Sequence, residues 1–432
     1  MNAASAKTFH RIPLGGGATL LAKRRSALPS VAVAAFVRGG TAYETEESNG
    51  VNAFTHRAMI KGTTSRTSGE IARESELFGA TIVPAYGADF SGISFQTLAR
   101  FLDPAFEVFA DLLAHPAFPA AVVESERSLL LADIVQEEDE PFQKTSREFQ
   151  RALFGADPYG LPGIGTAGSV RNLRREQLIA WHERFYRAEN LLFVVVGDFD
   201  EASVVARARA LLEALSDAHP RGASRGRIAD SAPAPPPAVT FESLASPREV
   251  VLERDVNQDV LLIGFPGPAA RHEDAYPLQV LSAVMSGMGN RLFVALRDRE
   301  GLCYYTGMYY RPLARAGVIG AYIGTSPEKE DRARAALDRE FARLLDDGVG
   351  ADEVVRAQNA LIGHAAIGRQ TNGAEASLAA RYELLGLGFE EADRYEERVL
   401  AVTPDQILGA ARRWLRPDRR VLAVTRPKRG PG

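Results

Sequence analysis

The residues of this chain that could take part in metal chemistry gather in two stretches far apart in the sequence. Residues 50–63, GVNAFTHRAMIKGT, contain one possible ligand, His56, followed directly by Arg57. Glu126 and Asp133 stand seven residues apart, which on a helix is two turns and places both carboxylates on one face. Imidazole and carboxylate groups bind zinc, but the guanidinium of Arg57 would repel a metal ion. The preferred interpretation is an ion-pair cluster of four residues: Arg57, Arg127, Glu126 and Asp133.

The stretch 50–63 resembles the zinc-binding helix of the inverted zincins, the pitrilysin, insulinase and mitochondrial-processing-peptidase family. That helix carries H-x-x-E-H and closes on K-G-T; its two His bind zinc, and its Glu activates the metal-bound water. This chain keeps the closing Lys61–Thr63. The first ligand then falls on Ala53, the catalytic Glu on His56 and the second ligand on Arg57. Because alanine has no lone pair to offer, the resemblance implies a degenerate metal site.

The resemblance also supplies a third ligand position, a Glu on a later helix, which falls here on Asp133. Glu126 matches a second acidic position that supports the ligands. We therefore expect no metal in this chain. A metalloenzyme that uses His56 with Asp133 is a separate alternative. The pair His182-Glu183 begins like a zincin helix, but Tyr186 occupies the place of the second His, so we expect this imidazole on the outer face of its helix.

Residues 286–305, SGMGNRLFVALRDREGLCYY, resemble the second signature of the family, in which an Arg precedes a Tyr by seven positions. Here these are Arg297 and Tyr304. In the family the pair reaches the metal-bearing half and hydrogen-bonds the carbonyl oxygen of the scissile peptide or the adjacent backbone. A fixed cation and a phenol donor stabilise the negative charge that develops on that oxygen. The alternative is structural: Arg297 pairs with Asp298 or Glu300, and Tyr304 is a half-buried strand residue.

The composition is that of a soluble globular protein and points to neither a nucleic-acid nor a membrane partner. Of the 432 residues, 46% are hydrophobic and 25% are charged, and the formal net charge is −4. The single cysteine, Cys303, excludes an intramolecular disulfide. The N-terminal segment lacks the apolar centre of a secretory signal, and no apolar run reaches the ~20 residues of a membrane helix. We expect a cytoplasmic protein, or a periplasmic one if a leader has been trimmed.

A linker and a repeated order of elements indicate two homologous domains. Residues 216–239 are rich in Pro, Ala, Gly and Arg and lack hydrophobic periodicity, as in an extended linker. Each half then shows a strand, a helical stretch, a second strand, an amphipathic helix, a further helix, and a closing helix and strand. Apart from the helical stretch, in the first half these are residues 31–40, 89–98, 104–113, 120–135 and 175–198; in the second they are residues 259–268, 317–326, 333–345, 351–366 and 404–427.

Each domain is expected to be α+β. Strands separated by helices, with alternating apolar residues, favour a largely antiparallel sheet with helices packed on one face. The resemblance implies the same fold over essentially the whole chain. We therefore predict an N-terminal domain, residues 1–215, that contains the degenerate metal site, and a homologous C-terminal domain, residues 240–432, that contains Arg297 and Tyr304.

Loss of the metal ligands together with retention of the Arg/Tyr pair predicts one half of a split zinc peptidase. In this lineage chains of this length associate in pairs, and in some pairs one subunit bears the metal and the other bears the Arg/Tyr pair. The resemblance implies a heterodimer with a homologous subunit that has an intact H-x-x-E-H and binds zinc. The two would enclose peptides or unfolded polypeptides in a chamber, where the substrate adds a strand to a sheet edge. The isolated chain is expected to be inactive, and it is either a monomer or a homodimer.

A non-catalytic scaffold is the alternative from a different functional class. Family members without catalytic activity serve as structural subunits of larger complexes, and a degenerate metal-binding helix fits that role too. A neighbouring reading frame that encodes a chain of similar length with H-x-x-E-H would favour the peptidase. Its absence would favour the scaffold.

Overall fold

The computed structural model describes residues 8–218, 233–241, 244 and 246–428. They form two compact units, and each unit takes a segment from the other half of the sequence. The first contains the described residues within 1–134, 162–236 and 368–393, and the second those within 135–161, 237–367 and 394–432. Most of the predicted linker, residues 216–239, lies outside the described residues; 216–218 end a helix, and 233–239 have no regular secondary structure.

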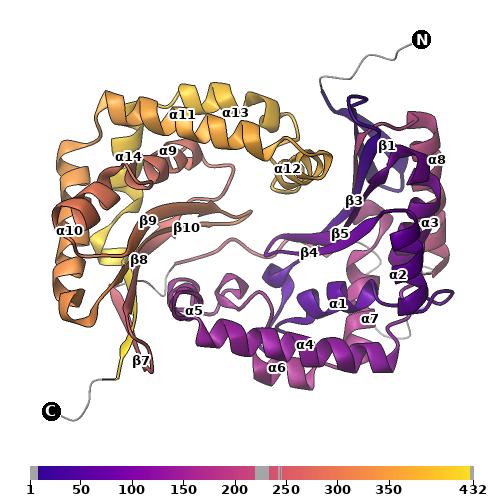
Figure 1. Cartoon of the computed structure of the whole chain (residues 1–432), viewed down its shortest axis with the longest axis horizontal. Helices are drawn as coiled ribbons and strands as arrows, with labels where there is room; N and C mark the ends of the chain where they lie inside the picture. Colours follow the sequence, from indigo (N-terminus) through magenta and orange to yellow (C-terminus); the bar gives the residue numbers. More distant parts are fainter. Residues whose placement is uncertain (1–7, 219–232, 242–243, 245, 429–432) are drawn as a thin grey trace. The chain divides into compact units, whose positions relative to one another are not determined.

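The first unit is built on a six-stranded sheet with the order β1-β2-β6-β3-β5-β4 (Figure 1). Strands β2 and β6 are parallel, and every other neighbouring pair is antiparallel. The central strands are runs of Val, Ala, Leu and Phe, which favour extended backbone, and they are buried along almost their whole length. The strands are β1 His10–Gly15, β2 Ala18–Arg24, β3 Ser30–Arg38, β4 Thr81–Tyr86, β5 Phe90–Leu98 and β6 Leu191–Gly197.

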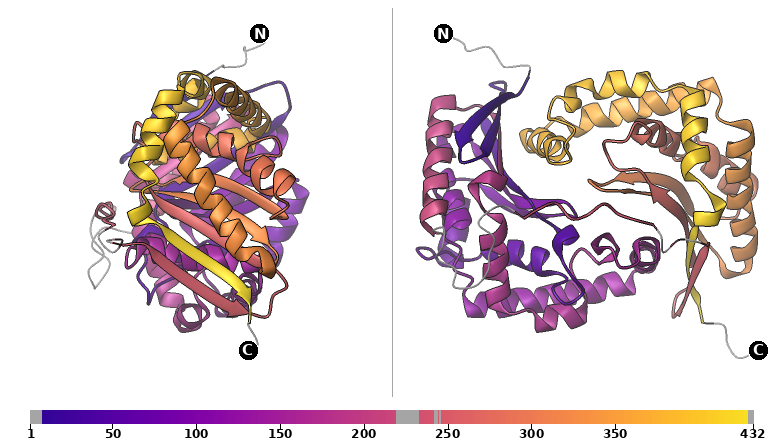
Figure 2. Two further views of the ribbon diagram at one scale, coloured as in Figure 1. Left: turned by 90° about the vertical axis from the view of Figure 1, so that its left-hand side faces the viewer. Right: turned by 180° about the vertical axis from the view of Figure 1, so that it is seen from behind.

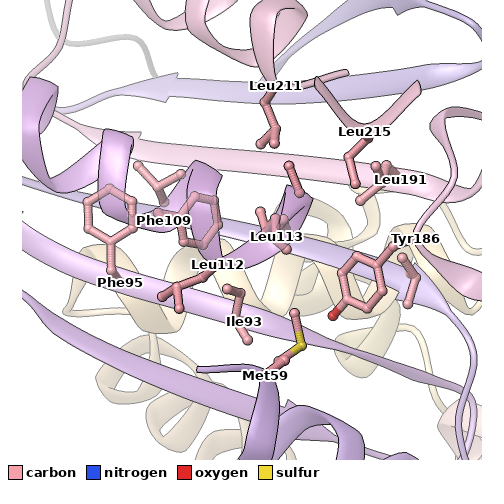
Figure 3. Close-up of a cluster of buried hydrophobic side chains, with 14 of the residues drawn as sticks. Met59, Ile93, Phe95, Phe109, Leu112, Leu113, Tyr186, Leu191, Leu211 and Leu215 are labelled. Atoms are coloured by element: carbon pink, nitrogen blue, oxygen red, sulfur yellow. The ribbon is translucent and has the colours of Figure 1, made fainter. Parts of the chain in front are cut away.

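Most helices of the first unit pack on one face of this sheet and close its larger core. Figure 3 shows Phe95 of β5 beside Phe109, whose ring centroid lies 5.0 Å away, with Leu112 and Tyr186 pointing into the same core. The helices are α1 Val51–Met59, α2 Ser68–Leu77, α3 Leu102–Ala114, α4 Ala120–Asp139, α6 Ala167–Asn172, α7 Arg175–Phe185 and α8 Glu201–Ala218. Residues 135–139 of α4 belong to the second unit.

The second unit repeats the topology of the first on a five-stranded sheet, β7-β11-β8-β10-β9. The parallel pair is β7 with β11, which lie side by side in the left view of Figure 2, and the other pairs are antiparallel. The strands are β7 Arg248–Arg254, β8 Asp259–Gly267, β9 Tyr305–Pro312, β10 Gly317–Thr325 and β11 Val421–Pro427. The helices are α9 Ala275–Met285, α10 Glu330–Asp347, α11 Ala351–Gly368, α13 Glu391–Leu400 and α14 Pro404–Trp414.

Two helices are exchanged between the halves of the sequence and cover the second face of each sheet. Helix α12 (Asn372–Leu384) packs on β3 and β6 of the first unit. Its Ala376, Ala379 and Ala380 are buried there, and its Glu375 accepts a hydrogen bond from the buried Lys23 Nζ at 2.7 Å. Helix α5 (Pro141–Phe154) packs on β8 and β11 of the second unit. A Cβ added at Gly264 of β8 would lie 2.3 Å from the ring of Phe149 of α5.

The predicted α+β class and the internal duplication are confirmed. The expected strand at 31–40 is β3, and the expected helix at 351–366 is α11; the other segments of the repeated series agree equally well. The exchanged helices are an addition to this scheme, and the boundaries at 215 and 240 stay predictions. Within the described residues, no helix combines the length and the apolar character needed to cross a membrane.

Candidate functional site

Helix α1 contains the residues of the predicted degenerate metal motif, and its N-terminus is fixed by a buried carboxylate. Gly50, the residue before the helix, has φ +91° and lies against the backbone of Gly165, so a side chain is excluded there. Glu44 accepts hydrogen bonds from the backbone N–H of Gly50 at 3.0 Å and of Asn52 at 2.9 Å. Burial raises the pKa of Glu44 to about 7, although these donors act in the opposite direction. The carboxylate therefore serves as the cap of α1.

His56 is fully buried, and both of its ring nitrogens are engaged. Nδ1 lies 2.8 Å from the carbonyl oxygen of Asn52, which can only accept, so Nδ1 carries the proton. Nε2 then accepts from the Tyr186 hydroxyl at 2.9 Å. Burial lowers the pKa of His56 to about 4 and raises that of Tyr186. The imidazole is thus a neutral hydrogen-bonding link between α1 and the end of α7.

Arg57, at the predicted position of the second metal ligand, forms ion pairs with two carboxylates. Its Nη1 donates to Asp133 at 2.6 Å and its Nε donates to Glu126 at 3.3 Å, both on α4. The Arg57 side chain is only 17% exposed. These ion pairs confirm the predicted cluster except for Arg127, which instead pairs with Glu124 of its own helix at 3.1 Å.

The residues present do not fit a zinc ion. Ala53 is fully buried and has no atom that could bind a metal. Both ring nitrogens of His56 are engaged in hydrogen bonds. The guanidinium of Arg57 forms ion pairs with the carboxylates that a metal ion would need as ligands. Throughout the described part of the chain, no three His, Cys, Asp or Glu side chains are grouped so that they could hold a metal. No catalytic step through a metal bound to this chain is therefore derived.

Elemental analysis of the purified chain is expected to find clearly less than one zinc per molecule. A chelator should also leave the melting temperature unchanged, because Arg57 already neutralises Glu126 and Asp133. About one tightly held zinc per chain, lost on His56→Ala, would contradict this expectation and favour the metalloenzyme that uses His56 with Asp133.

Acid is expected to destabilise the chain through His56. Its folded pKa of about 4 lies below the ordinary 6.5, so between these values the unfolded state binds a proton that the folded state excludes. Stability is therefore lost as pH falls from 6.5 towards 4, by about 3 kcal/mol in total. His56→Gln should remove this slope in urea unfolding, although the variant is less stable than the wild type above pH 6.5.

The comparison with His56→Gln isolates one group because both proteins keep Glu44. The raised pKa of Glu44 acts in the opposite direction: its contribution is present below pH 4.5 and is lost as pH rises through about 7. His364→Gln, at an exposed imidazole of α11, is the matched control and should keep the wild-type slope. Parallel stability curves for the wild type and His56→Gln would contradict the assignment.

Arg297 and Tyr304 lie in the second unit, on either side of a short turn, and both are exposed. Arg297 belongs to a π-helical turn, η5 (Phe293–Arg299), and Tyr304 directly precedes β9 and is 60% exposed. For the described residues, neither side chain has a hydrogen-bond or ion-pair partner. Glu300 pairs with Arg339 instead of Arg297, so the structural alternative for the pair is not supported.

Two family models match the chain, one for each half. The model described as insulinase, peptidase family M16, matches residues 20–167, and the one described as peptidase M16 inactive domain matches residues 172–361. The chain belongs to the M16 peptidase family. Helix α1 falls within the first match, whereas Arg297 and Tyr304 fall within the second.

Relatives of this M16 chain are similar to it over nearly their whole length. A protein of Streptomyces coelicolor named an uncharacterized zinc protease is 25% identical over 98% of this chain and 91% of its own length. A peptidase M16 inactive domain from Pseudomonas fluorescens has 22% identity and a TM-score of 0.85, covering 98% of this chain and 99% of that one. A chain of complex III from Candida albicans has 18% identity and a TM-score of 0.79, covering 96% and 95%.

Sequence reasoning misplaced one residue of this region and missed another. His182 is buried, not on the outer face of α7; its Nε2 lies 2.9 Å from the Leu113 carbonyl oxygen, and its ring stacks on Tyr186 with centroids 4.6 Å apart. The bond from Tyr186 to His56 spans 130 positions and has no local signal in the sequence. The apolar residues Leu178, Trp181 and Phe185 recur at helical spacing and indicate the inward face of α7 in the sequence.

Proposed function

We propose that this chain is the substrate-binding, non-metal-bearing subunit of a heteromeric zinc metallopeptidase. The observation that carries the proposal is the contrast between two sites of one chain. Arg57 is committed to Glu126 and Asp133, which leaves no place for a metal, whereas Arg297 and Tyr304 are exposed and uncommitted. Family membership and relatives named zinc proteases support peptide hydrolysis as the reaction.

In this proposal the chemistry is divided between two chains. A homologous partner with an intact H-x-x-E-H holds the zinc and the attacking water. In this chain the Arg297 guanidinium and the Tyr304 hydroxyl donate hydrogen bonds to the carbonyl oxygen of the scissile peptide or to the adjacent backbone. In this proposal both donors stabilise the negative charge that develops on the carbonyl oxygen. Peptides or unfolded polypeptides are the substrates, and the isolated chain is inactive.

A non-catalytic scaffold is the second candidate, because the fold also occurs in a chain of complex III from Candida albicans. A scaffold predicts a stable complex without peptide hydrolysis. It also gives no reason for an uncommitted Arg297 beside an exposed Tyr304.

Affinity purification of the chain from its native host separates the two candidates. The peptidase proposal expects a partner of similar length with H-x-x-E-H, about one zinc per complex, and hydrolysis of an unfolded test polypeptide that a chelator abolishes. A purified complex without such a partner and without hydrolysis would overturn it and favour the scaffold.

A further inference from the structure

The guanidinium of Arg297 rests on an aromatic ring. Its Cζ lies 4.7 Å from the centroid of the Phe293 ring, four residues earlier in the same π-helical turn. A cation over a ring is held by the quadrupole of the ring. Such a contact uses no hydrogen-bond acceptor, so the N–H groups of the guanidinium stay available for a ligand. Turns of this π-helical kind are often found at functional sites.

One of the two acids that could neutralise Arg297 is held by another residue. Glu300 follows Arg297 by three positions and directly succeeds the π-helical turn. Its two carboxylate oxygens instead accept from Nη2 of Arg339, on α10, at 2.8 and 3.0 Å. Arg339 thereby keeps a negative charge away from Arg297.

The backbone between Arg297 and Tyr304 is fixed to the sheet. The Leu302 N–H donates to the Leu296 carbonyl oxygen at 2.7 Å, and the buried Thr325 hydroxyl donates to the Leu302 carbonyl oxygen at 2.5 Å. Because Leu302 is anchored through both its N–H and its carbonyl oxygen, the remaining freedom of Arg297 lies in its side chain. The group that contacts this side chain therefore determines the position of the guanidinium.

We infer that Phe293 is the positioning residue for Arg297 and that Arg339 complements it by withholding Glu300. The Phe293 ring lies against the guanidinium, and Arg339 engages one of the two neighbouring acids, so Arg297 stays an uncommitted cation for a peptide carbonyl. This inference deepens the proposed function and rests on it for the ligand. The placement of the guanidinium is tested without a partner or a substrate.

Cys303 is a built-in reporter of the Arg297 charge. It is the only cysteine in the sequence, and burial raises the pKa of its thiol to about 11, while the charge of Arg297 lowers it. Since the thiolate is the reactive form, the rate of alkylation by iodoacetamide in mildly alkaline buffer follows the proximity of that charge. The experiment uses the full chain, with circular dichroism to verify that each variant is folded.

Arg297→Ala is expected to slow alkylation and to define the rate without the cation. Phe293→Leu should fall between this rate and the wild-type rate, and Phe293→Tyr should restore the wild-type rate because it keeps the ring. Wild-type alkylation in Phe293→Leu would overturn the inference. An unchanged rate in Arg297→Ala would overturn it as well, because the guanidinium would then lie elsewhere.

Arg339→Ala provides a second test at an exposed position, where folding is not at risk. It should slow alkylation by freeing Glu300 to approach Arg297, and the double variant Arg339→Ala/Glu300→Gln should recover the wild-type rate. Arg343→Ala, which removes an exposed arginine of the same helix, is the matched control and should leave the rate unchanged. Equal slowing by both single variants would contradict a specific role for Arg339.

Peptide turnover by the complex then separates this inference from the proposed function. Phe293→Leu should lower kcat/KM by roughly 2- to 5-fold and Phe293→Tyr should not, in proportion to the loss of a cation–π contact. If alkylation responds as expected but neither Phe293→Leu nor Arg297→Ala alters turnover, the positioning stands and the proposed function fails. If Arg297→Ala abolishes turnover while Phe293→Leu leaves both readouts unchanged, the proposed function stands and the positioning fails.

Discussion

Arg297→Ala is expected to lower kcat/KM of the heteromeric complex about 10²- to 10³-fold, the loss seen when one preorganised donor to a developing oxyanion is removed. The loss should appear mainly in kcat, because the donor acts most strongly when negative charge has developed on the carbonyl oxygen. Tyr304→Phe, which removes only the hydroxyl, should show a loss of the same kind. The measurement is steady-state hydrolysis of a fluorogenic peptide by the purified complex.

Arg299→Ala is the matched control for Arg297→Ala. Arg299 is an exposed arginine of the same π-helical turn, two residues further on, so the control removes the same charge from nearly the same place. Its kcat/KM should stay within a few-fold of the wild type. Undiminished turnover in both Arg297→Ala and Tyr304→Phe would contradict the assigned role. An equal loss in Arg299→Ala would mean that the positive charge of this turn, and not a specific hydrogen bond from Arg297, supports turnover.

The outline of the site follows from residue chemistry, whereas its fine structure depends on the fold. The sequence places Arg57 in one helix and two acids on one face of another, and this predicts the ion pairs that are present. Opposite charges in a half-buried region stabilise each other when they pair. The hydrogen bond from Tyr186 to His56 arises only when two helices meet, and no spacing rule links them. The support of Arg297 by Phe293 is a local i, i+4 pair and could have been predicted from spacing alone.

The fold shows the same division between local and long-range information. Hydrophobic periodicity is a local signal and predicts β3, β10, α4 and α11 close to their observed bounds. The packing of α5 and α12 on the sheets depends on long-range contacts, but the sequence does indicate that two strands are covered on both faces. The strands β6 and β8 are nearly continuous apolar runs, LLFVVVG and DVLLIGFPG, a pattern that indicates strands covered on both faces. Helices on one face alone cannot satisfy such strands.

Ala379→Asp in α12 is expected to destabilise the first unit by at least about 3 kcal/mol, because it places an unpaired charge in an apolar core. Ala379 is fully buried against the second face of the sheet, next to Phe36 and Val194. Ser377→Asp adds the same charge to an exposed position of the same helix and should change stability by less than about 0.5 kcal/mol. The free energy of unfolding in urea gives both values.

Hydrogen exchange locates the damage caused by Ala379→Asp. The amides of β3 and β6 lie under α12 and should lose protection first, whereas β8 and β11, which lie under α5, should lose less. Equal stability of Ala379→Asp and Ser377→Asp would contradict the packing of α12 on this sheet. Since α12 comes from the second half of the sequence, selective loss in β3 and β6 would mean that the first half does not supply a complete core by itself.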